Sequence, residues 1–292
     1  MSIYLTGASG FVGKNLISYF DKKVLIKKHV RDSEFLITQN TVIHLAGKAH
    51  DLKNISNKDE YYEVNTELTK QIFDSFLISD SSVFIMLSSV KAVADNVVGI
   101  LNEDCEPNPK THYGKSKLLA ERYILSKNIP GNKRVYILRP CMIHGPNNKG
   151  NLNLLYKLVS KRIPWILGAF KNMRSYCSID NLLFVINEFI HNNAIPSGVY
   201  NVADDEHLST NEIISLMAKS NNKKTIIFNV YPFIIKIIAK IGDVIPLPLN
   251  SERLKKLTES YMVSNEKLKK YIENKLPLTS RVGIINTFKT YK

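Results

Sequence analysis

The sequence of 292 residues predicts an α/β fold, in which a doubly wound parallel sheet is followed by a smaller C-terminal region. Two observations predict this fold. Apolar runs typical of buried strands alternate with stretches of helical periodicity over residues 1–140, and such alternation is characteristic of a parallel sheet with right-handed crossovers. A glycine-rich turn joins the first strand to the first helix. Beyond residue 140 the alternation becomes irregular, which indicates a region of different architecture.

The segment MSIYLTGASGFVG at residues 1–13 predicts a buried strand, a tight turn and the start of a helix. Gly7 permits the turn, Gly10 lets the backbone approach a pyrophosphate, and Gly13 lets the helix pack closely on the strand. The free N–H groups and the positive dipole end of the helix then face the phosphates. A glycine triplet alone is a weak motif, but the strand before it and the helix after it predict a dinucleotide site.

The remaining elements of the sheet follow in chain order. We expect helices at residues 11–20, 59–79, 112–127 and 151–162, and strands at 24–31, 41–47, 82–89 and 134–140. The short interval before residue 41 leaves room only for a vestigial third strand at 35–37. Ligands of such sheets bind outside the carboxyl ends of the strands, so Gly7, Ala46, Ser89 and Pro140 are expected to line one crevice.

Charge and composition exclude several classes of function. The net charge of +14 comes from lysines spread along the chain in short pairs, outside any recognisable nucleic-acid motif, so we expect a solvated basic surface and no nucleic-acid partner. The three cysteines form no C-x-x-C pair and no signal peptide is evident, which predicts a cytoplasmic protein without a metal site.

The apolar stretch at residues 231–242 is interrupted by lysines and is shorter than the roughly 20 residues that span a bilayer. We therefore expect no stable membrane insertion. A helix packed into the C-terminal region is the favoured interpretation, and an amphipathic helix lying on a surface is the alternative.

A serine, a tyrosine and a lysine suggest proton transfer at a carbonyl or carbinol. Tyr113 and Lys117 lie one helical turn apart, and Ser89 closes the strand upstream. The serine would hold the substrate oxygen, the tyrosine would pass the proton, and the lysine would lower the phenol pKa. Bringing that pKa from about 10 to about 7 requires about 4 kcal/mol, which the lysine and a positive nicotinamide ring are expected to supply.

Six motifs in order carry a family resemblance: TGASGFVG, HLAG, YEVNTELT, LSSVK, YGKSK and LRPCMIHGP. With them the chain, from residue 1 to about 285, resembles the nucleotide-sugar branch of the extended short-chain dehydrogenase/reductase family. It is most similar to the group of UDP-glucose 4-epimerase-like proteins and UDP-N-acetyl-6-deoxyhexosamine 4-ketoreductases. That resemblance implies a Rossmann-type fold, a UDP-sugar substrate and a role in O-antigen, capsule or lipopolysaccharide biosynthesis.

The resemblance also implies roles for individual residues. The implied catalytic residues are Ser89, Tyr113 and Lys117. The implied cofactor-binding residues, apart from Tyr113 and Lys117 themselves, are Gly7, Ser9, Gly10, Phe11, Val12, Gly13, Leu45, Ala46, Gly47, Asn65, Ser88 and Pro140. Asn65 is expected to support the active-site backbone. The implied substrate-binding residues are Asn151 and Arg174. Lys91 is added from its position two residues after Ser89, with a solvated or structural side chain as the alternative.

Two departures from the family pattern are informative. Val90 and Lys91 follow Ser89 where dehydratases carry an Asp-Glu pair, so a 4,6-dehydratase is not expected. The second strand ends in a basic stretch that includes Lys28 and Arg31, where members that prefer NAD carry an acid. NADP(H) is therefore the favoured cofactor, with Arg31 on the 2′-phosphate, and NAD(H) is the alternative.

The favoured function is a 4-ketoreductase acting on a UDP-4-keto-6-deoxy-N-acetylhexosamine. A UDP-glucose or UDP-N-acetylglucosamine 4-epimerase is the alternative. A non-catalytic dinucleotide sensor or scaffold is a third option, against which the intact serine, tyrosine and lysine argue. Residues 1–140 are expected to form the dinucleotide-binding domain, to which residues 175–203 return, and 141–292 mainly the substrate region. A homodimer is one option for the assembly.

Overall fold

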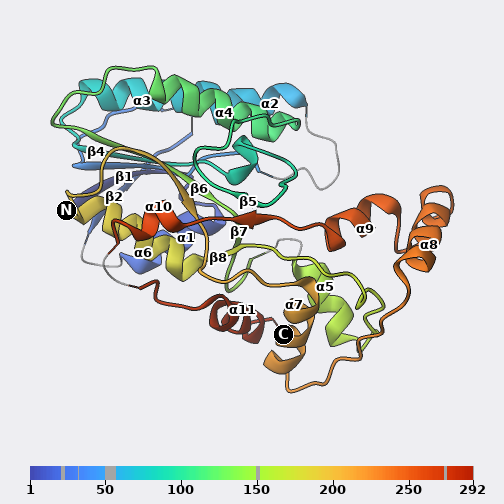
Figure 1. The fold of residues 1–292 in the computed structure, drawn as a ribbon. Helices are drawn as coiled ribbons and strands as arrows, with labels where there is room; N and C mark the ends of the chain where they lie inside the picture. Colours follow the sequence, from blue (N-terminus) through green and yellow to red (C-terminus); the bar gives the residue numbers. More distant parts are fainter. Residues whose placement is uncertain (21–23, 32, 50–56, 149–151, 273–274, 292) are drawn as a thin grey trace.

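A six-stranded parallel sheet forms the centre of the molecule in the computed structural model, which describes residues 1–20, 24–31, 33–49, 57–148, 152–272 and 275–291 (Figure 1). In sheet order the strands are β2 (Leu25–Lys28), β1 (Ser2–Thr6), β3 (Thr41–His44), β4 (Val83–Leu87), β6 (Arg134–Pro140) and β9 (Gly198–Val202). The chain passes from β1 to β2 on one side and from β2 to β3 on the other. This reversal confirms the doubly wound α/β fold and marks the carboxyl ends of β1 and β3 as the ligand-binding edge.

Helices cover both faces of the sheet (Figure 1). One face carries α2 (Lys58–Tyr62), the π-helical turn η1 (Glu63–Glu67), α3 (Leu68–Ile78) and α4 (His112–Leu125), and the other carries α1 (Phe11–Tyr19), α6 (Ile179–His191) and α10 (Glu266–Lys269). Successive strand residues alternate between the two cores: Ile3 and Leu5 pack on the α1 and α6 side, and Tyr4 packs on the α3 and α4 side. Burial on both faces explains why the inner strands β1, β3, β4 and β6 are largely apolar runs, whereas the edge strand β2 is mostly exposed.

The vestigial strand expected at residues 35–37 is wrong, because this segment forms no strand. Its contacts with β2 and the residue after it run through side chains. Lys27 Nζ donates to Leu36 O at 2.7 Å, and the Phe35 ring stacks on His29 with centroids 4.7 Å apart. The connection from β2 to β3 is thus held without adding a strand to the edge of the sheet.

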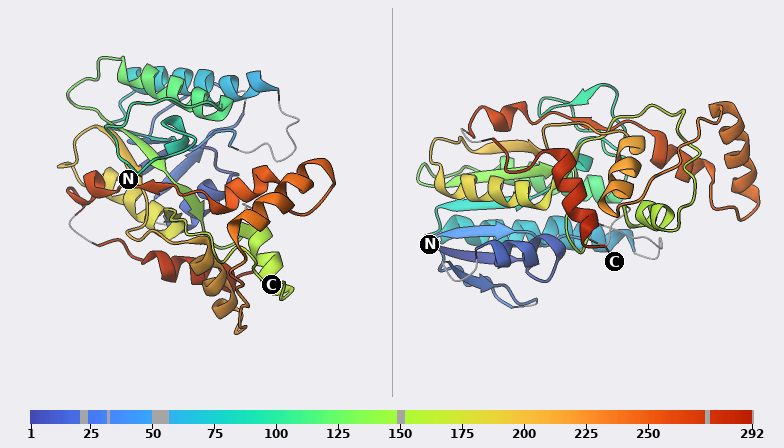
Figure 2. Two further views of the ribbon diagram at one scale, coloured as in Figure 1. Left: turned by 45° about the vertical axis from the view of Figure 1, so that its right-hand side comes forward. Right: turned by 90° about the horizontal axis from the view of Figure 1, so that it is seen from below.

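The C-terminal region packs around a core of its own. Its helices are α5 (Leu152–Ser160), α7 (Thr210–Ser220), α8 (Pro232–Val244), α9 (Ser251–Thr258) and α11 (Ser280–Lys289), and two short ladders join β5 (Ile100–Leu101) to β10 (Met262–Val263) and β7 (Met142–His144) to β8 (Tyr176–Ser178). Figure 2 shows α8 and α9 projecting from the end of the molecule remote from the sheet. The packed helix expected at residues 231–242 is correct only in part, because α8 buries just Ile235 and Ala239.

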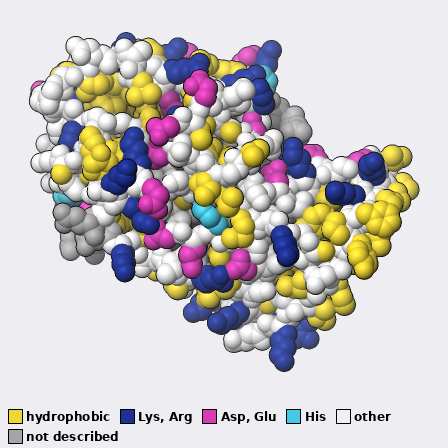
Figure 3. Space-filling model, viewed as in Figure 1, with side chains coloured by type: hydrophobic (Ala, Val, Ile, Leu, Met, Phe, Trp, Pro, Cys, Tyr) yellow, Lys and Arg dark blue, Asp and Glu magenta, His cyan; other side chains and the backbone are white. Residues whose placement is uncertain are grey.

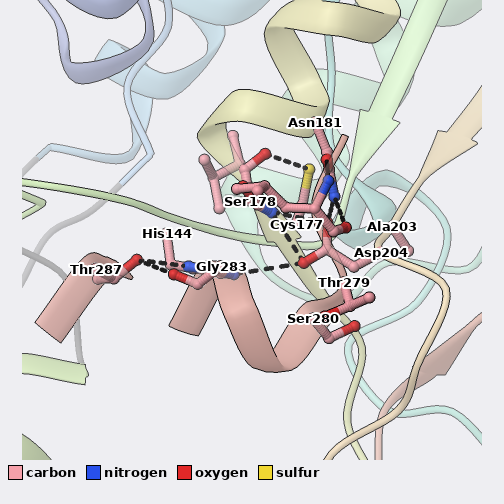
Figure 4. Close-up of polar contacts among 12 residues, drawn as sticks. His144, Cys177, Ser178, Asn181, Ala203, Asp204, Thr279, Ser280, Gly283 and Thr287 are labelled. Carbon is pink, nitrogen blue, oxygen red and sulfur yellow. Dashed lines mark hydrogen bonds and ion pairs between the residues drawn. The ribbon is translucent and has the colours of Figure 1, made fainter. Parts of the chain in front are cut away.

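A buried polar cluster fastens α11 to the rest of the chain (Figure 4). The Asp204 carboxylate accepts hydrogen bonds from Ser178 N at 3.0 and 3.1 Å and from Asn181 Nδ2 at 2.7 Å. His144 Nε2 lies 3.5 Å from the same carboxylate, and His144 Nδ1 is 2.9 Å from Thr287 Oγ1 on α11. Because buried polar groups are costly when unpaired, this cluster specifies how β7, β8, α6 and α11 meet.

Candidate active site

The glycine turn between β1 and α1 forms one wall of the candidate site. Gly7 has φ +69°, and a Cβ there would lie 2.6 Å from both Ala46 N and Leu45 C, so only glycine fits. A Cβ at Gly13 would overlap Gly7 O and lie 2.8 Å from Ala8 Cα. Gly10 is exposed at the start of α1, where no side chain caps the helix. Backbone N–H groups at this open helix start can bind a pyrophosphate.

The second wall is formed at the ends of β3 and β4, where Lys117 from α4 reaches across. Its Nζ donates to Leu87 O at 2.9 Å, and a Cβ at Gly47 would lie only 2.8 Å from that Nζ. Burial lowers the pKa of Lys117 to about 8, opposed by the nearby Glu121 carboxylate. Gly47 and Lys117, which the sequence predicted as site residues, therefore lie close together at one edge of the sheet.

Asn65 lies in the π-helical turn that interrupts the helix expected at residues 59–79. Its Oδ1 accepts from Lys48 N at 2.8 Å, and its Nδ2 donates to Lys48 O at 3.1 Å and to Ser116 Oγ at 2.9 Å. These bonds tie the segment after β3 to α4, one residue before Lys117. Turns of this kind are frequent at functional sites because they redirect a side chain.

Ser89 and Tyr113 meet at the end of β4. Thr111 caps α4 by accepting from Gly114 N at 3.2 Å, which sets Tyr113 in the first turn. Burial raises the pKa of Tyr113, and its hydrogen bond with Ser89 lowers that pKa in part. The Lys117 ammonium donates to a backbone carbonyl at the end of β4, and the expected lowering of the Tyr113 pKa by this lysine together with a bound nicotinamide ring stays a prediction.

A buried ion pair under the site was not anticipated from the sequence. Arg139 donates to Glu121 through Nε at 3.1 Å and through a second nitrogen at 2.6 Å, and both side chains are almost fully buried. The Ser88 hydroxyl also donates to Glu121, so this predicted cofactor-binding side chain is committed to the protein. The sequence did indicate that Glu121 lies near the site, because it follows Lys117 by four residues on the same helical face.

His44 connects the two walls through a buried hydrogen-bond chain and was also overlooked. Ala46 N donates to Thr6 Oγ1 at 3.2 Å, and that hydroxyl is 2.7 Å from His44 Nδ1. His44 Nε2 is 2.9 Å from Thr69 Oγ1, which donates to Asn65 O at 2.7 Å. Burial, reinforced by the Lys117 charge, lowers the pKa of His44 to about 3 and keeps the imidazole neutral.

The other predicted residues are distributed around this centre. Pro140 ends β6, opposite Val202 of β9. Ser9 is exposed, and Phe11 and Val12 are partly exposed in the first turn of α1. Arg31 is exposed beyond the end of β2. Asn151 lies outside the described residues.

Lys91 and Arg174, expected to bind substrate, already have protein partners. Lys91 Nζ donates to Asp95 O at 2.8 Å and lies 4.0 Å from the centre of the Tyr261 ring, and burial lowers the pKa of Lys91. Arg174 donates to Lys256 O at 2.7 Å and pairs with Glu259 at 3.5 Å. Both cations are therefore held in fixed positions, and part of the donor capacity of Arg174 is taken.

The part of the chain that the structure describes has neither a metal-binding cluster nor a helix that could cross a membrane. No group of three or more His, Cys, Asp or Glu side chains there is arranged to hold a metal ion. Within the same residues, no helix combines the length and the apolar character needed to cross a membrane.

The chain is similar in sequence to a known protein family and in fold to solved structures. The model of the NAD dependent epimerase/dehydratase family matches residues 3–203. The chain is 29% identical to UDP-glucose 4-epimerase of Vibrio cholerae, over 99% of this chain and 95% of that protein. It is 30% identical to N-acetyl-alpha-D-glucosaminyl-diphospho-ditrans,octacis-undecaprenol 4-epimerase of Escherichia coli O157:H7, over 76% of this chain and 73% of that protein. The structure of UDP-N-acetylglucosamine 4-epimerase from Bacillus cereus superposes with a TM-score of 0.77 at 18% identity, covering 99% and 98% of the two chains.

Proposed function

The chain belongs to the NAD dependent epimerase/dehydratase family, and from that premise we propose that it is an NAD(P)-dependent oxidoreductase acting at C4 of a nucleotide-activated sugar. The observation that carries the proposal is the contact set at one sheet edge. Ser89 lies near enough to Tyr113 to lower the pKa of its phenol in part, Lys117 lies against Gly47, and the glycine turn opens beside them. A sensor or scaffold would have no use for this proton-relay set.

The glycine turn fits a dinucleotide, because Gly10 is exposed at the start of α1 and no side chain covers the free N–H groups there. Gly7, Gly10 and Gly13 would hold the pyrophosphate, and Lys117 would bind the nicotinamide ribose. A nicotinamide ring bound there would exchange a hydride with C4 of the sugar. Ser89 would hydrogen-bond the C4 oxygen, and Tyr113 would donate a proton to that oxygen or remove one from it.

We propose the reductive direction with NADPH, so that the reaction is reduction of a 4-keto-6-deoxy-N-acetylhexosamine linked to UDP. Lys28 and Arg31 at the end of β2 support this direction, because a 2′-phosphate needs cations within hydrogen-bonding reach. Arg31 is exposed and follows β2, the strand that pairs with β1, by three residues.

Cofactor titration of the Arg31→Asp variant tests the proposal. Loss of one charged contact worth about 1.5–3 kcal/mol should weaken NADPH binding by about ten- to a hundredfold and leave NADH binding little changed. Lys161→Asp, an equal charge change at an exposed position of the C-terminal region, is the control. Equal affinity of the wild type for NADH and NADPH would remove the basis for the reductive direction.

A 4-epimerase is the second candidate. It is supported by the two relatives described above, both of which are named as 4-epimerases. Their named substrates share a sugar joined through a diphosphate, and Arg174 is the proposed clamp for that group. An epimerase keeps its cofactor through the cycle, so NAD⁺ that stays bound through purification would support epimerisation. Exchangeable NADP(H) would support reduction.

A further inference from the structure

Helix α8 presents a large apolar face to solvent. Only Ile235 and Ala239, four residues apart, are buried against the C-terminal core. The opposite side of the helix, here named the α8 apolar face, consists of Phe233, Ile234, Ile237, Ile238, Ile241 and Val244. Phe233 is 66% exposed and Val244 is 87% exposed. A continuous apolar face of this kind on a monomer usually marks an interaction site.

The apolar surface continues into the segment that precedes α8. Tyr231, Phe228 and Ile226 are each more than half exposed. Figure 3 shows hydrophobic side chains gathered over α8, and Figures 1 and 2 show this helix projecting from the molecule. The face is therefore carried on a protruding element.

Cations border the α8 apolar face. Lys236 and Lys240 are exposed and lie one turn apart, and neither forms an ion pair with any residue that the structure describes. The one acid of α8, Asp243, is engaged by Ser251, whose N and Oγ donate to it at 2.9 and 2.6 Å. An apolar helix face flanked by lysines matches the charge pattern of a helix that lies on an anionic membrane surface.

We propose that α8 docks the protein on an anionic lipid bilayer, with its apolar face at the headgroup boundary and Lys236 and Lys240 on anionic headgroups. The positive charge of the protein favours a bilayer over a second copy of this chain as the partner of this face. The net charge of +14 on each molecule opposes self-association through this face, whereas anionic lipid neutralises it. At 13 residues α8 is too short to span the membrane and would lie along its surface. The inference is independent of the reaction proposed above.

Vesicle flotation of the full chain tests the proposal, with phosphatidylcholine vesicles prepared with and without phosphatidylglycerol. The wild type should float with the anionic vesicles, and added salt should weaken binding. The double variant Ile237→Glu/Ile241→Glu should lose binding. Ile78→Glu, at a 90% exposed position on α3, is the matched control and should bind as the wild type does.

The pair Lys236→Gln/Lys240→Gln leaves the apolar face intact and should weaken binding by about fivefold for each lysine removed. Thermal unfolding of every variant verifies that the fold is retained. A wild type that never floats would overturn the proposal. So would binding that survives Ile237→Glu/Ile241→Glu, or an oligomer without vesicle binding that this double variant splits into monomers.

Discussion

Replacing Gly47 by alanine perturbs the position of Lys117 with a single methyl group. The new Cβ would lie 2.8 Å from Lys117 Nζ and 3.1 Å from Asn65 Oδ1. Both distances are shorter than ordinary contacts of a carbon atom, so at least one of the polar atoms must move. The lysine is the side chain that can yield, because its ammonium is the end of a flexible stem.

The size of the effect follows from what Lys117 loses. Its Nζ donates to Leu87 O at 2.9 Å, and a shift of several tenths of an ångström weakens this bond and misplaces the cation. Misplacement of a positioning group by about 1 Å can cost about a hundredfold in rate. We therefore expect kcat/KM to fall by about ten- to a hundredfold in Gly47→Ala, with the free energy of unfolding changed by less than about 1 kcal/mol.

Steady-state kinetics, cofactor titration and urea unfolding of Gly47→Ala separate these effects. Gly131→Ala is the matched control, because a Cβ there would meet no atom within 4 Å. Wild-type kcat/KM and cofactor affinity in Gly47→Ala would refute the inference that Lys117 acts from this position. If Gly47→Ala unfolds while Gly131→Ala stays folded, Gly47 serves the fold and not the position of Lys117.

Three further predictions concern the relay, the fold and the pH dependence of stability. Tyr113→Phe should bind cofactor normally yet lose two to four orders of magnitude in turnover, the range of general acid catalysis, and near-normal turnover would exclude Tyr113 from the mechanism. Asp204→Asn should lower the free energy of unfolding by about 3 kcal/mol in urea titrations, because buried donors lose a carboxylate, and an unchanged midpoint would contradict this. Burial lowers the pKa of His44 from 6.5 to about 3. Between these two pH values the unfolded state binds a proton that the native state does not bind. Stability should therefore drop by about 1.4 kcal/mol per pH unit below pH 6.5, and His44→Gln should flatten that slope; equal slopes would show that His44 is not responsible.

The sequence predicted the sheet well because local patterns encode it. Buried strands such as Arg134–Pro140 are apolar runs, and the glycine turn marks the first crossover. The predicted strand at residues 35–37 failed because an apolar triplet does not reveal whether its backbone finds a ladder partner. The exposed face of α8 was also hidden, since periodicity shows that a helix is apolar but not what covers it.

Within the site, the sequence suggested candidate residues but did not reveal the partners that they have in the fold. The proximity of Lys117 and Gly47 depends on how α4 crosses the end of β3, which is a tertiary property. The chain through His44 joins residues that are distant in sequence, as does the pair of Glu121 with Arg139. Burial raises the pKa of Tyr113, and burial depends on the packing of the whole fold, which local sequence patterns do not reveal.

Transfer of deuterium from NADPH labelled at C4 of the nicotinamide tests the central claim most directly. The protein is incubated with the labelled cofactor and a UDP-4-keto-6-deoxy-N-acetylhexosamine, and the product is examined by NMR and mass spectrometry. We expect deuterium at C4 of the sugar and one NADP⁺ formed for each sugar reduced. Absence of label at C4, or interconversion of UDP-N-acetylglucosamine with its C4 epimer without consumption of NADPH, would contradict the claim.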